Sequence, residues 1–319
     1  MKQPKKVYIA SCSPTGGIFQ YSLSEDGKLT FVKSTECDRP MYAVIDKGRM
    51  YVLLRAPFEC SDESGLISYD VACDGSLEKP TDVISTKGVV ACHLAVKNDD
   101  VYCVNYLSGS VIKMPETLVT HIGKGVHPKR QEAPHTHFAG FSPDGKYLCV
   151  TDLGLDTVFF YNPGLELVGQ VKVPSGHGAR HLVFSRDGKY MFVANELAST
   201  VSSFRYDGKS FDYIETVSCL PENIRVESTA SAIRYHCGKI YVSNRGHDSV
   251  SVLEHKDGRM TLSGNIDCGG ESPRDFDIAD GFLICTNEKS NSVTVTKLDT
   301  FEKTCELTNI QTPLCVVLG

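Results

Sequence analysis

The stretch that decides the fold is HLVFSRDGKYMFVANELASTVSSFRYDGKSF, residues 181–211. It contains three apolar runs rich in Val, Phe and Tyr, separated by an Asp-Gly turn and by a polar corner at Asn195 and Glu196. Asp-Gly between alternating runs is typical of β-hairpins, because both residues tolerate the positive φ that tight turns need. The stretch therefore predicts three antiparallel strands joined by short connections.

The same pattern recurs along the chain at a spacing of roughly 40 to 50 residues. Clear copies cover residues 137–162, 232–260 and 275–299, residues 7–29 form a first unit, and weaker copies begin near Tyr42 and His93. Seven such units fit, and no stretch has convincing helical periodicity over a dozen residues. This predicts an all-β chain that forms a seven-bladed β-propeller.

The two ends of the chain are expected to complete one blade. The terminal TPLCVVLG, residues 312–319, is a lone strand with no hairpin partner after it, and the N-terminal unit is one strand short. Pairing of the N- and C-terminal strands would close the ring and remove an exposed edge. We therefore expect residues 1–319 to form a single β-propeller domain.

Composition excludes several classes of partner. A net charge of -6 without long basic runs argues against nucleic acid binding. No window approaches 18 consecutive apolar residues, and no apolar leader-like run precedes the first strand, so neither membrane insertion nor export is expected. The thirteen cysteines are scattered, many inside apolar strands, and no C-x-x-C occurs. A reducing cytoplasm is the expected location.

Polar residues recur at two positions of the repeat. The start of the first strand carries His93, His137, Arg180 with His181, and Arg274; the end of the second strand carries Asn105, Asp152, Asn195 with Glu196, Asn244 with Arg245, and Asn287 with Glu288. In a propeller, equivalent corners of successive blades converge on one mouth of the channel. These positions predict a binding site, although turn formation is an open alternative for Asn and Asp.

Glu196 is the strongest candidate for a reactive group. A carboxylate that follows an apolar strand is partly desolvated, which raises its pKa unless a cation compensates. Arg180, at the other corner of the same hairpin, is the candidate cation. Such a pair can be a structural salt bridge, or in a cleft a general base with a charge-stabilising partner.

Two motifs carry a resemblance to a known family. They are R-H-x-x-F with N-E-L, around residues 180–197, and S-N-R-G-H-D-S, residues 243–249. They resemble segments of the bacterial seven-bladed lactonases, which include propeller-type 6-phosphogluconolactonases and are related to carboxy-muconate lactonizing enzymes. The resemblance covers nearly the whole chain, which contains no tryptophan and so lacks the Trp-Asp propeller signature.

The resemblance implies a lactone site at one mouth of the channel. The implied catalytic residues are Glu196, His137, Arg180 and Arg245; His181 and His135 are implied neighbours, with Gln131 in the segment that leads to them. Their place in the repeat adds Arg274, Asn195 and Asn244 as expected substrate-binding residues.

We expect hydrolysis of a sugar lactone, above all of 6-phosphogluconolactone to 6-phosphogluconate, without a metal or other cofactor. Glu196 would activate water, Arg180 and Arg245 would hold the anion, and His137 would orient the substrate or shuttle a proton. No G-x-S-x-G motif supports an acyl-enzyme route. The expected partner is a small anionic lactone, and the protein is expected to be a monomer or a weak homo-oligomer.

Three alternatives stay open. The first is a cycloisomerase acting on a carboxy-muconate-like dicarboxylate, which would use the same arginines and acid/base group. The second is a non-catalytic propeller that binds a ligand or a protein, because one fold hosts many functions. The third is a metalloenzyme, with a histidine cluster formed by His135, His137, His177 and His181, although no supporting carboxylate set is evident.

Overall fold

The protein is built from strands. The computed structural model describes residues 4–319, and over that range no helix is present, so none is long and apolar enough to cross a membrane. The strands of these residues form seven antiparallel sheets, six with four strands and one with five. They divide into two compact units: a central unit, Cys92–Ile266, and a terminal unit, which combines the residues up to Ala91 with Asp267–Gly319.

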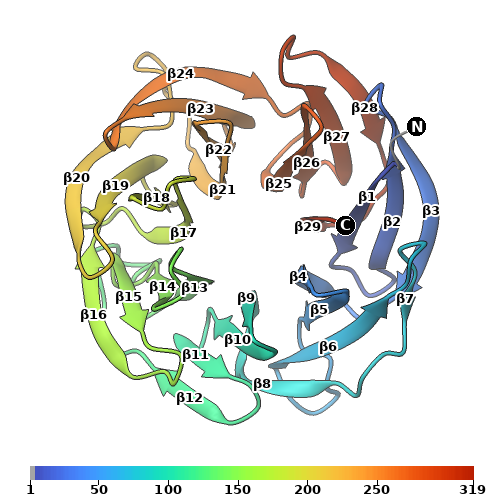
Figure 1. Cartoon of the computed structure of the whole chain (residues 1–319), viewed down its shortest axis with the longest axis horizontal. Coiled ribbons are helices and arrows are strands. Elements are labelled where there is room, and N and C mark those ends of the chain that lie inside the picture. Colours follow the sequence, from blue (N-terminus) through green and yellow to red (C-terminus); the bar gives the residue numbers. More distant parts are fainter. Residues whose placement is uncertain (1–3) are drawn as a thin grey trace. The chain divides into compact units, whose positions relative to one another are not determined.

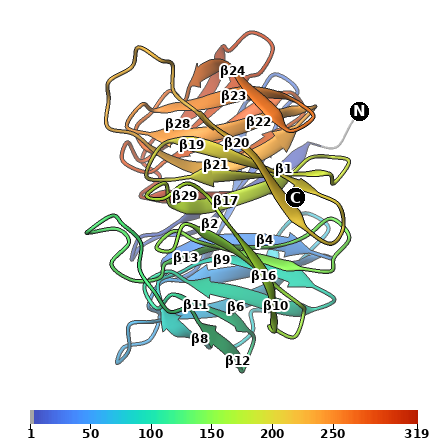
Figure 2. The same cartoon turned by 90° about the vertical axis from the view of Figure 1, so that its left-hand side faces the viewer.

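The central unit contains four of the sheets, and in each of them strands consecutive in sequence are neighbours. The first strands of three sheets, β13, β17 and β21, pack against one another in turn, and neighbouring sheets of this unit lie face to face (Figure 1, Figure 2). The strands are β9 (Ala91–Lys97), β10 (Asp100–Asn105), β11 (Ser110–Lys113), β12 (Thr117–Thr120), β13 (Thr136–Phe141), β14 (Leu148–Asp152), β15 (Thr157–Tyr161), β16 (Leu167–Lys172), β17 (Ala179–Phe184), β18 (Tyr190–Asn195), β19 (Thr200–Tyr206), β20 (Phe211–Ser218), β21 (Thr229–His236), β22 (Lys239–Arg245), β23 (Ser249–Lys256) and β24 (Arg259–Asp267).

The second strand β18 has a continuous apolar run, residues 190–194, because both of its faces are covered. In β18, Met191 and Val193 pack into the core shared with the β13–β16 sheet. Phe192 and Ala194, which point to the opposite face, pack into the core shared with the β21–β24 sheet. Alternation of side chains along a strand thus delivers successive residues to two different cores. This accounts for the continuous run YMFVA, where a sheet with one solvated face would alternate apolar and polar residues.

The turn between the first and second strands has the chemistry that the sequence predicts. Asp187 Oδ1 accepts a hydrogen bond from Ser185 Oγ at 2.6 Å and another from the Lys189 amide at 3.2 Å. Gly188 takes a φ of 72°, in the region that glycine enters without a steric cost. Residues 142–145 repeat the arrangement in the preceding sheet.

The terminal unit holds the other three sheets. The β4–β8 sheet has five strands because both β7 and β8 pair with β6. The strands are β1 (Lys5–Ser11), β2 (Gly17–Leu23), β3 (Leu29–Glu36), β4 (Pro40–Asp46), β5 (Arg49–Leu54), β6 (Glu63–Val71), β7 (Leu77–Glu78), β8 (Ile84–Val89), β25 (Pro273–Ala279), β26 (Phe282–Asn287), β27 (Ser292–Lys297), β28 (Lys303–Leu307) and β29 (Pro313–Leu318).

The last strand of the chain pairs with the first. The sheet order is β29-β1-β2-β3, with Val7 opposite Leu318 and Ile9 opposite Val316 (Figure 1). The prediction that the N- and C-terminal strands complete one blade is confirmed. The prediction of one domain over residues 1–319 stays a prediction.

Deletion of residues 312–319 tests the contribution of this pairing. The deletion removes the β29 ladder and exposes the edge of β1, and it also removes the buried side chains of Leu314, Cys315 and Val316. Burial of one such aliphatic side chain is worth about 1.5–3 kcal/mol. We expect the melting temperature to fall by about 10 °C or more, measured by calorimetry. Deletion of Gly319 alone is the control, and equal melting of the two truncated proteins would contradict a role for β29.

Candidate functional site

Glu196 occupies a fixed corner of the central unit. It directly follows β18, and its amide donates to the Gly178 carbonyl at 2.8 Å while its own carbonyl accepts from the Ala230 amide at 3.1 Å. These bonds tie its backbone both to its own sheet and to β21 of the next. The side chain is 4% exposed. The carboxylate is therefore held in place by the strand ends of two sheets.

Three arginines contact this carboxylate, and they divide its two oxygens between them. Oε2 accepts from Arg180 Nε at 2.9 Å and lies 3.1 Å from Arg245 Nη2. Oε1 accepts from Arg130 Nη2 at 2.5 Å. Arg180 is almost fully buried, with 2% of its side chain exposed, whereas the side chain of Arg130 is 38% exposed. Oε2 thus contacts buried Arg180, whereas Oε1 contacts Arg130, a cation that solvent reaches.

β-Bulges present the first-strand residues to the site. The register between β17 and β18 shifts between Ala179 and His181, so Arg180 is the extra residue. The register between β13 and β14 shifts in the same way at His137, between Thr136 and Phe138. A bulge turns a side chain out of the regular alternation of the strand, and bulges often occur beside active sites. Equivalent bulges explain why the first-strand position is polar in both sheets.

The arginines outweigh burial in setting the ionisation of Glu196. Burial alone would raise the pKa of this carboxyl group, but Arg245, Arg180, His137 and Arg130 all act to lower it. The pKa therefore lies well below its ordinary value of 4.5. Glu196 is ionised at neutral pH, as expected where cations compensate desolvation.

Histidine rings form a buried group in the same unit. The ring of His181 lies 5.1 Å from that of His93 and 5.3 Å from that of His137, centroid to centroid. Burial, followed by the charge of nearby arginines, holds the pKa values of His93 and His181 well below the usual range. These two imidazoles are neutral at physiological pH, so they can form hydrogen bonds but add no charge to the site.

Tyr106 links the histidines to Arg130. Its ring stacks on His135 at 4.5 Å and meets His137 edge-on at 5.4 Å, and its hydroxyl accepts from Arg130 Nη2 at 3.4 Å. His135 Nδ1 lies 3.1 Å from the Tyr106 carbonyl oxygen. His135 therefore supports Tyr106, and Tyr106 in turn lies beside the guanidinium of Arg130.

The predicted asparagines bind their own sheets. Asn195 Nδ2 donates to Thr200 Oγ1 at 3.0 Å and to Ser202 Oγ at 2.9 Å. Asn244 Nδ2 donates in the same way to Ser251 Oγ at 2.6 Å, and Asn287 repeats the pattern with Thr294 at 3.2 Å. This recurrence favours a corner-forming role for the asparagines, whereas the residue after each of them (Glu196, Arg245, Glu288) is the one that enters an ion pair.

Arg274 lies in the terminal unit. Its Nη1 is 3.6 Å from Glu288 Oε2, and it occupies a bulge between Pro273 and Asp275 like those at His137 and Arg180. The structure thus brings Glu196, Arg180 and Arg245 into direct contact and places His137, His181 and His135 in the same unit. The assigned roles of all these residues stay predictions.

Sequence reasoning missed Arg130 and Tyr106. Arg130 lies on the irregular segment between β12 and β13, where no strand alternation indicates the direction of a side chain. The available signal was its place directly before Gln131, in the segment leading to His135 and His137. Tyr106 directly follows Asn105, so it occupies the corner position that Glu196 and Arg245 occupy in their own sheets.

The donor set around Glu196 does not fit a metal ion. Three guanidinium groups contact its carboxylate, and their positive charge opposes the approach of another cation. Within the described range, residues 4–319, no group of three or more His, Cys, Asp or Glu side chains is arranged to hold a metal. The site is better suited to an anion.

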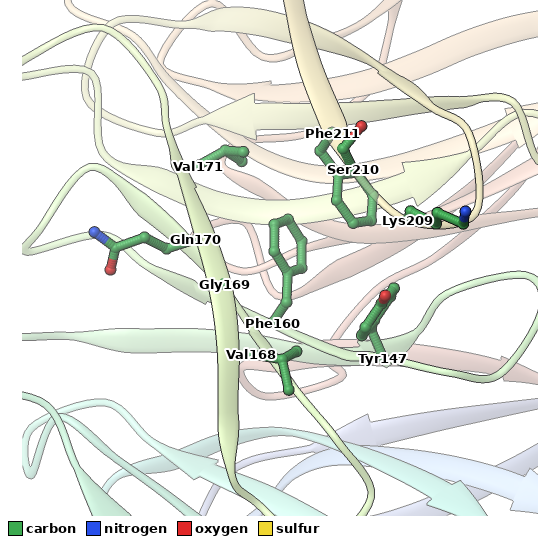
Figure 3. Close-up of a pocket in the computed structure, with 9 residues that line it drawn as sticks. All are labelled: Tyr147, Phe160, Val168, Gly169, Gln170, Val171, Lys209, Ser210 and Phe211. Carbon is green, nitrogen blue, oxygen red and sulfur yellow. The ribbon is translucent and has the colours of Figure 1, made fainter.

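A separate aromatic pocket lies at the outer strands of the central unit. It has a volume of about 210 Å³ and is lined by residues of the β13–β16 and β17–β20 sheets, among them Tyr147, Phe160, Lys209 and Phe211 (Figure 3). Phe160 and Phe211 stack at 4.0 Å. The lining contains no carboxylate and no histidine. It therefore lacks the acid/base groups that distinguish the Glu196 site.

Comparison with known proteins places the chain in a family. Residues 6–317 match the family described as "Lactonase, 7-bladed beta-propeller", and the chain belongs to it. An uncharacterized protein of Staphylococcus epidermidis is 30% identical over 323 residues, which cover 93% of this chain and 92% of that protein. The all-β class and the seven-bladed β-propeller fold predicted from the sequence are confirmed.

Two solved structures share the fold. A candidate 6-phosphogluconolactonase from Bacteroides fragilis superposes with a TM-score of 0.86 at 23% identity, over 99% of this chain and 98% of that one. A periplasmic gluconolactonase from Pseudomonas aeruginosa, PpgL, superposes with a TM-score of 0.86 at 21% identity, over 98% of both chains. At these identities the likeness establishes the fold alone.

The depressed pKa of Glu196 predicts an acid-sensitive contribution to stability. Because the pKa is lowered in the folded protein, the ionised carboxylate stabilises the fold fully above its ordinary pKa of 4.5, and this contribution is lost progressively as the pH falls from 4.5 through the lower pKa of the folded protein. We expect Glu196→Gln to melt below the wild type at neutral pH and the gap to narrow at about pH 3.5. Calorimetry at both pH values measures this. A gap of the same size in acid would show that the ion pairs do not set the ionisation of Glu196.

Proposed function

We propose that the protein hydrolyses a sugar lactone by general acid/base catalysis without a metal ion, with 6-phosphogluconolactone as the preferred substrate. The observation that carries the proposal is the division of the Glu196 carboxylate: Oε2 contacts Arg180 and Arg245, and Oε1 contacts the partly exposed side chain of Arg130. A carboxylate fixed through one oxygen can use the other to accept a proton. Membership of the lactonase family supports the reaction class.

In the proposed reaction, Glu196 Oε1 removes a proton from a water molecule, and the water oxygen bonds to the lactone carbonyl carbon. The carbonyl becomes a tetrahedral oxyanion. When it collapses, the bond from the carbonyl carbon to the ring oxygen breaks and the ring oxygen leaves with a proton from His137, which the proton on Glu196 then replaces. One lactone and one water give one hydroxy acid.

The arginines have different roles in this scheme. Arg180 is buried against Oε2, so it positions Glu196 and keeps it ionised. The Arg245 side chain is 14% exposed and contacts both Glu196 Oε2 and the Ala230 carbonyl oxygen. Arg245 is thus the better placed of the two to stabilise the oxyanion, because preorganised cations in a dry site act strongly on developing charge.

The substrate assignment draws on two proteins with the same fold: a gluconolactonase from P. aeruginosa and a candidate 6-phosphogluconolactonase from B. fragilis. Both concern lactones of gluconic acid. A site that gathers three arginines about one carboxylate suits an anionic member of that class, because a guanidinium binds phosphate or carboxylate through two parallel hydrogen bonds.

Glu196→Gln tests the base. The amide keeps the shape and accepts hydrogen bonds but cannot take the proton, so we expect kcat to fall by about 10² to 10⁴ while KM changes little. The assay follows hydrolysis of 6-phosphogluconolactone, unphosphorylated gluconolactone and a carboxy-muconolactone. The wild type should show its highest kcat/KM with the phosphorylated lactone and should keep its activity after chelation.

Two results would contradict the proposal. Full activity of Glu196→Gln would exclude Glu196 as the base and make His137 the candidate. Loss of wild-type activity on chelation, with recovery on adding a divalent metal, would replace general acid/base catalysis by metal catalysis. As the control variant we use Gln170→Glu at the aromatic pocket, which changes charge outside the site and should leave all rates unchanged.

A further inference from the structure

We propose that Arg130 recognises the anionic group of the substrate, and that on binding its guanidinium transfers from Glu196 Oε1 to that group and thereby uncovers the base. The inference deepens the proposed function and rests on it, because it assigns the substrate class and a switch to the same site. Arg130 is then both the specificity residue for a phosphate or carboxylate and a latch on Glu196.

The first support is the asymmetry of the carboxylate. Oε2 lies 2.9 Å from Arg180 Nε and 3.1 Å from Arg245 Nη2, whereas Oε1 accepts from Arg130 Nη2 at 2.5 Å. A water molecule activated by Oε1 would need the place that this guanidinium now occupies. The arrangement described here is therefore a resting state, and Arg130 has to move before the proposed proton transfer can occur.

The second support is that Arg130 can move without any change in the backbone. The neighbouring Gln131 anchors the segment. Its side-chain Nε2 donates to the Leu153 carbonyl at 2.9 Å and to Asp156 Oδ1 at 2.7 Å. Its backbone accepts a hydrogen bond from the Gly125 amide and donates one to the His127 carbonyl. The Arg130 side chain itself is 38% exposed. A long side chain on a fixed base can exchange one anion for another by rotation alone.

The third support is the chemical identity of the alternative partner. Among residues 4–319, Arg130 uses Nη2 to contact both Glu196 and the Tyr106 hydroxyl, the latter at 3.4 Å, so its Nε and Nη1 donors are available to a further acceptor. A planar guanidinium binds a phosphate or a carboxylate through two donors at once, whereas a neutral hydroxyl offers only a weak single contact. Only a substrate that carries an anionic group can therefore compete for Arg130.

The exchange would also correct a mismatch in basicity. Glu196 is surrounded by Arg130, Arg180, Arg245 and His137, and a carboxylate whose pKa is held far below neutrality is a weak proton acceptor. Neutralising one of these cations with a substrate anion raises the basicity of Glu196 at the moment when it is needed. A substrate without the anion leaves the latch in place.

Arg130→Gln tests the inference against Lys129→Gln, which removes a positive charge from the adjacent exposed position of the same segment. The substrates are a phosphorylated, a carboxylated and a neutral sugar lactone. For the anionic lactone that Arg130 recognises, we expect KM to rise about 10- to 100-fold in Arg130→Gln, since a hydrogen bond to a charged group is lost. Activity on the neutral lactone should be kept or increased, because Oε1 is permanently uncovered. Lys129→Gln should behave as the wild type.

The pH profile gives a readout that a structural role would not change. The acid limb of kcat/KM reports the free enzyme's base. Removal of one of its cations raises the pKa of Glu196, so the acid limb should shift to higher pH in Arg130→Gln and stay in place in Lys129→Gln. Equal losses with charged and neutral lactones, or an unchanged acid limb, would overturn the inference.

The proposed lactonase activity and the Arg130 latch can be tested separately. If Glu196→Gln is inactive but Arg130→Gln loses activity equally on all three lactones, the lactonase mechanism stands and the latch is wrong. If the wild type hydrolyses none of the lactones, the proposed function is wrong. Calorimetry with 6-phosphogluconate then tests recognition alone: binding that is weakened in Arg130→Gln and intact in Lys129→Gln would support the anion site, and equal binding to both variants would overturn it.

Discussion

The buried charge of Glu196 is the constraint on which the rest of the site depends. Moving a carboxylate out of water costs several kcal/mol unless cations and hydrogen bonds replace its hydration. Here the replacement is a set of arginines from three places in the central unit: the start of β17, the end of β22 and the segment before β13. β17, β22 and the segment before β13 each hold one arginine within reach of the carboxylate.

Two adjacent residues have different roles at the corner that follows the second strand: one shapes the turn and the next forms an ion pair. The asparagine at or next to the end of the second strand binds hydroxyl groups of the third strand and shapes the turn, as Asn195 and Asn244 do. The next residue enters an ion pair: Glu196 directly follows β18, and Arg245 is the last residue of β22. At the first strand, a β-bulge takes Arg180 out of the regular pairing with β18. A rigid repeated scaffold thus supplies positions whose side chains vary while the strands do not.

The sequence predicts the strands and the closure well because each has a local cause. Apolar runs indicate buried strands, and Asp-Gly indicates a turn. TPLCVVLG has no hairpin partner next to it in the sequence, so its pairing with the first unit follows by elimination. The pairing of Arg180 with Glu196 also follows, since both belong to one hairpin. The bulges do not follow, because an extra residue in a strand leaves no mark in the composition. Arg130 was missed for a related reason: in an irregular segment, only tertiary contacts such as those of Gln131 fix the direction of a side chain.

Direct titration of Glu196 tests the central claim most closely. Protein labelled with carbon-13 at the glutamate carboxyl carbon allows its signal to be followed by NMR, with Glu196→Gln providing the assignment. We predict a Glu196 pKa well below 4.5 in the free protein and a higher pKa when 6-phosphogluconate is bound, because the ligand anion draws Arg130 away. A free-protein pKa at or above 4.5, or one that does not rise with the ligand, would contradict the view that arginines hold this carboxylate ionised and that the substrate's anion releases it as a base.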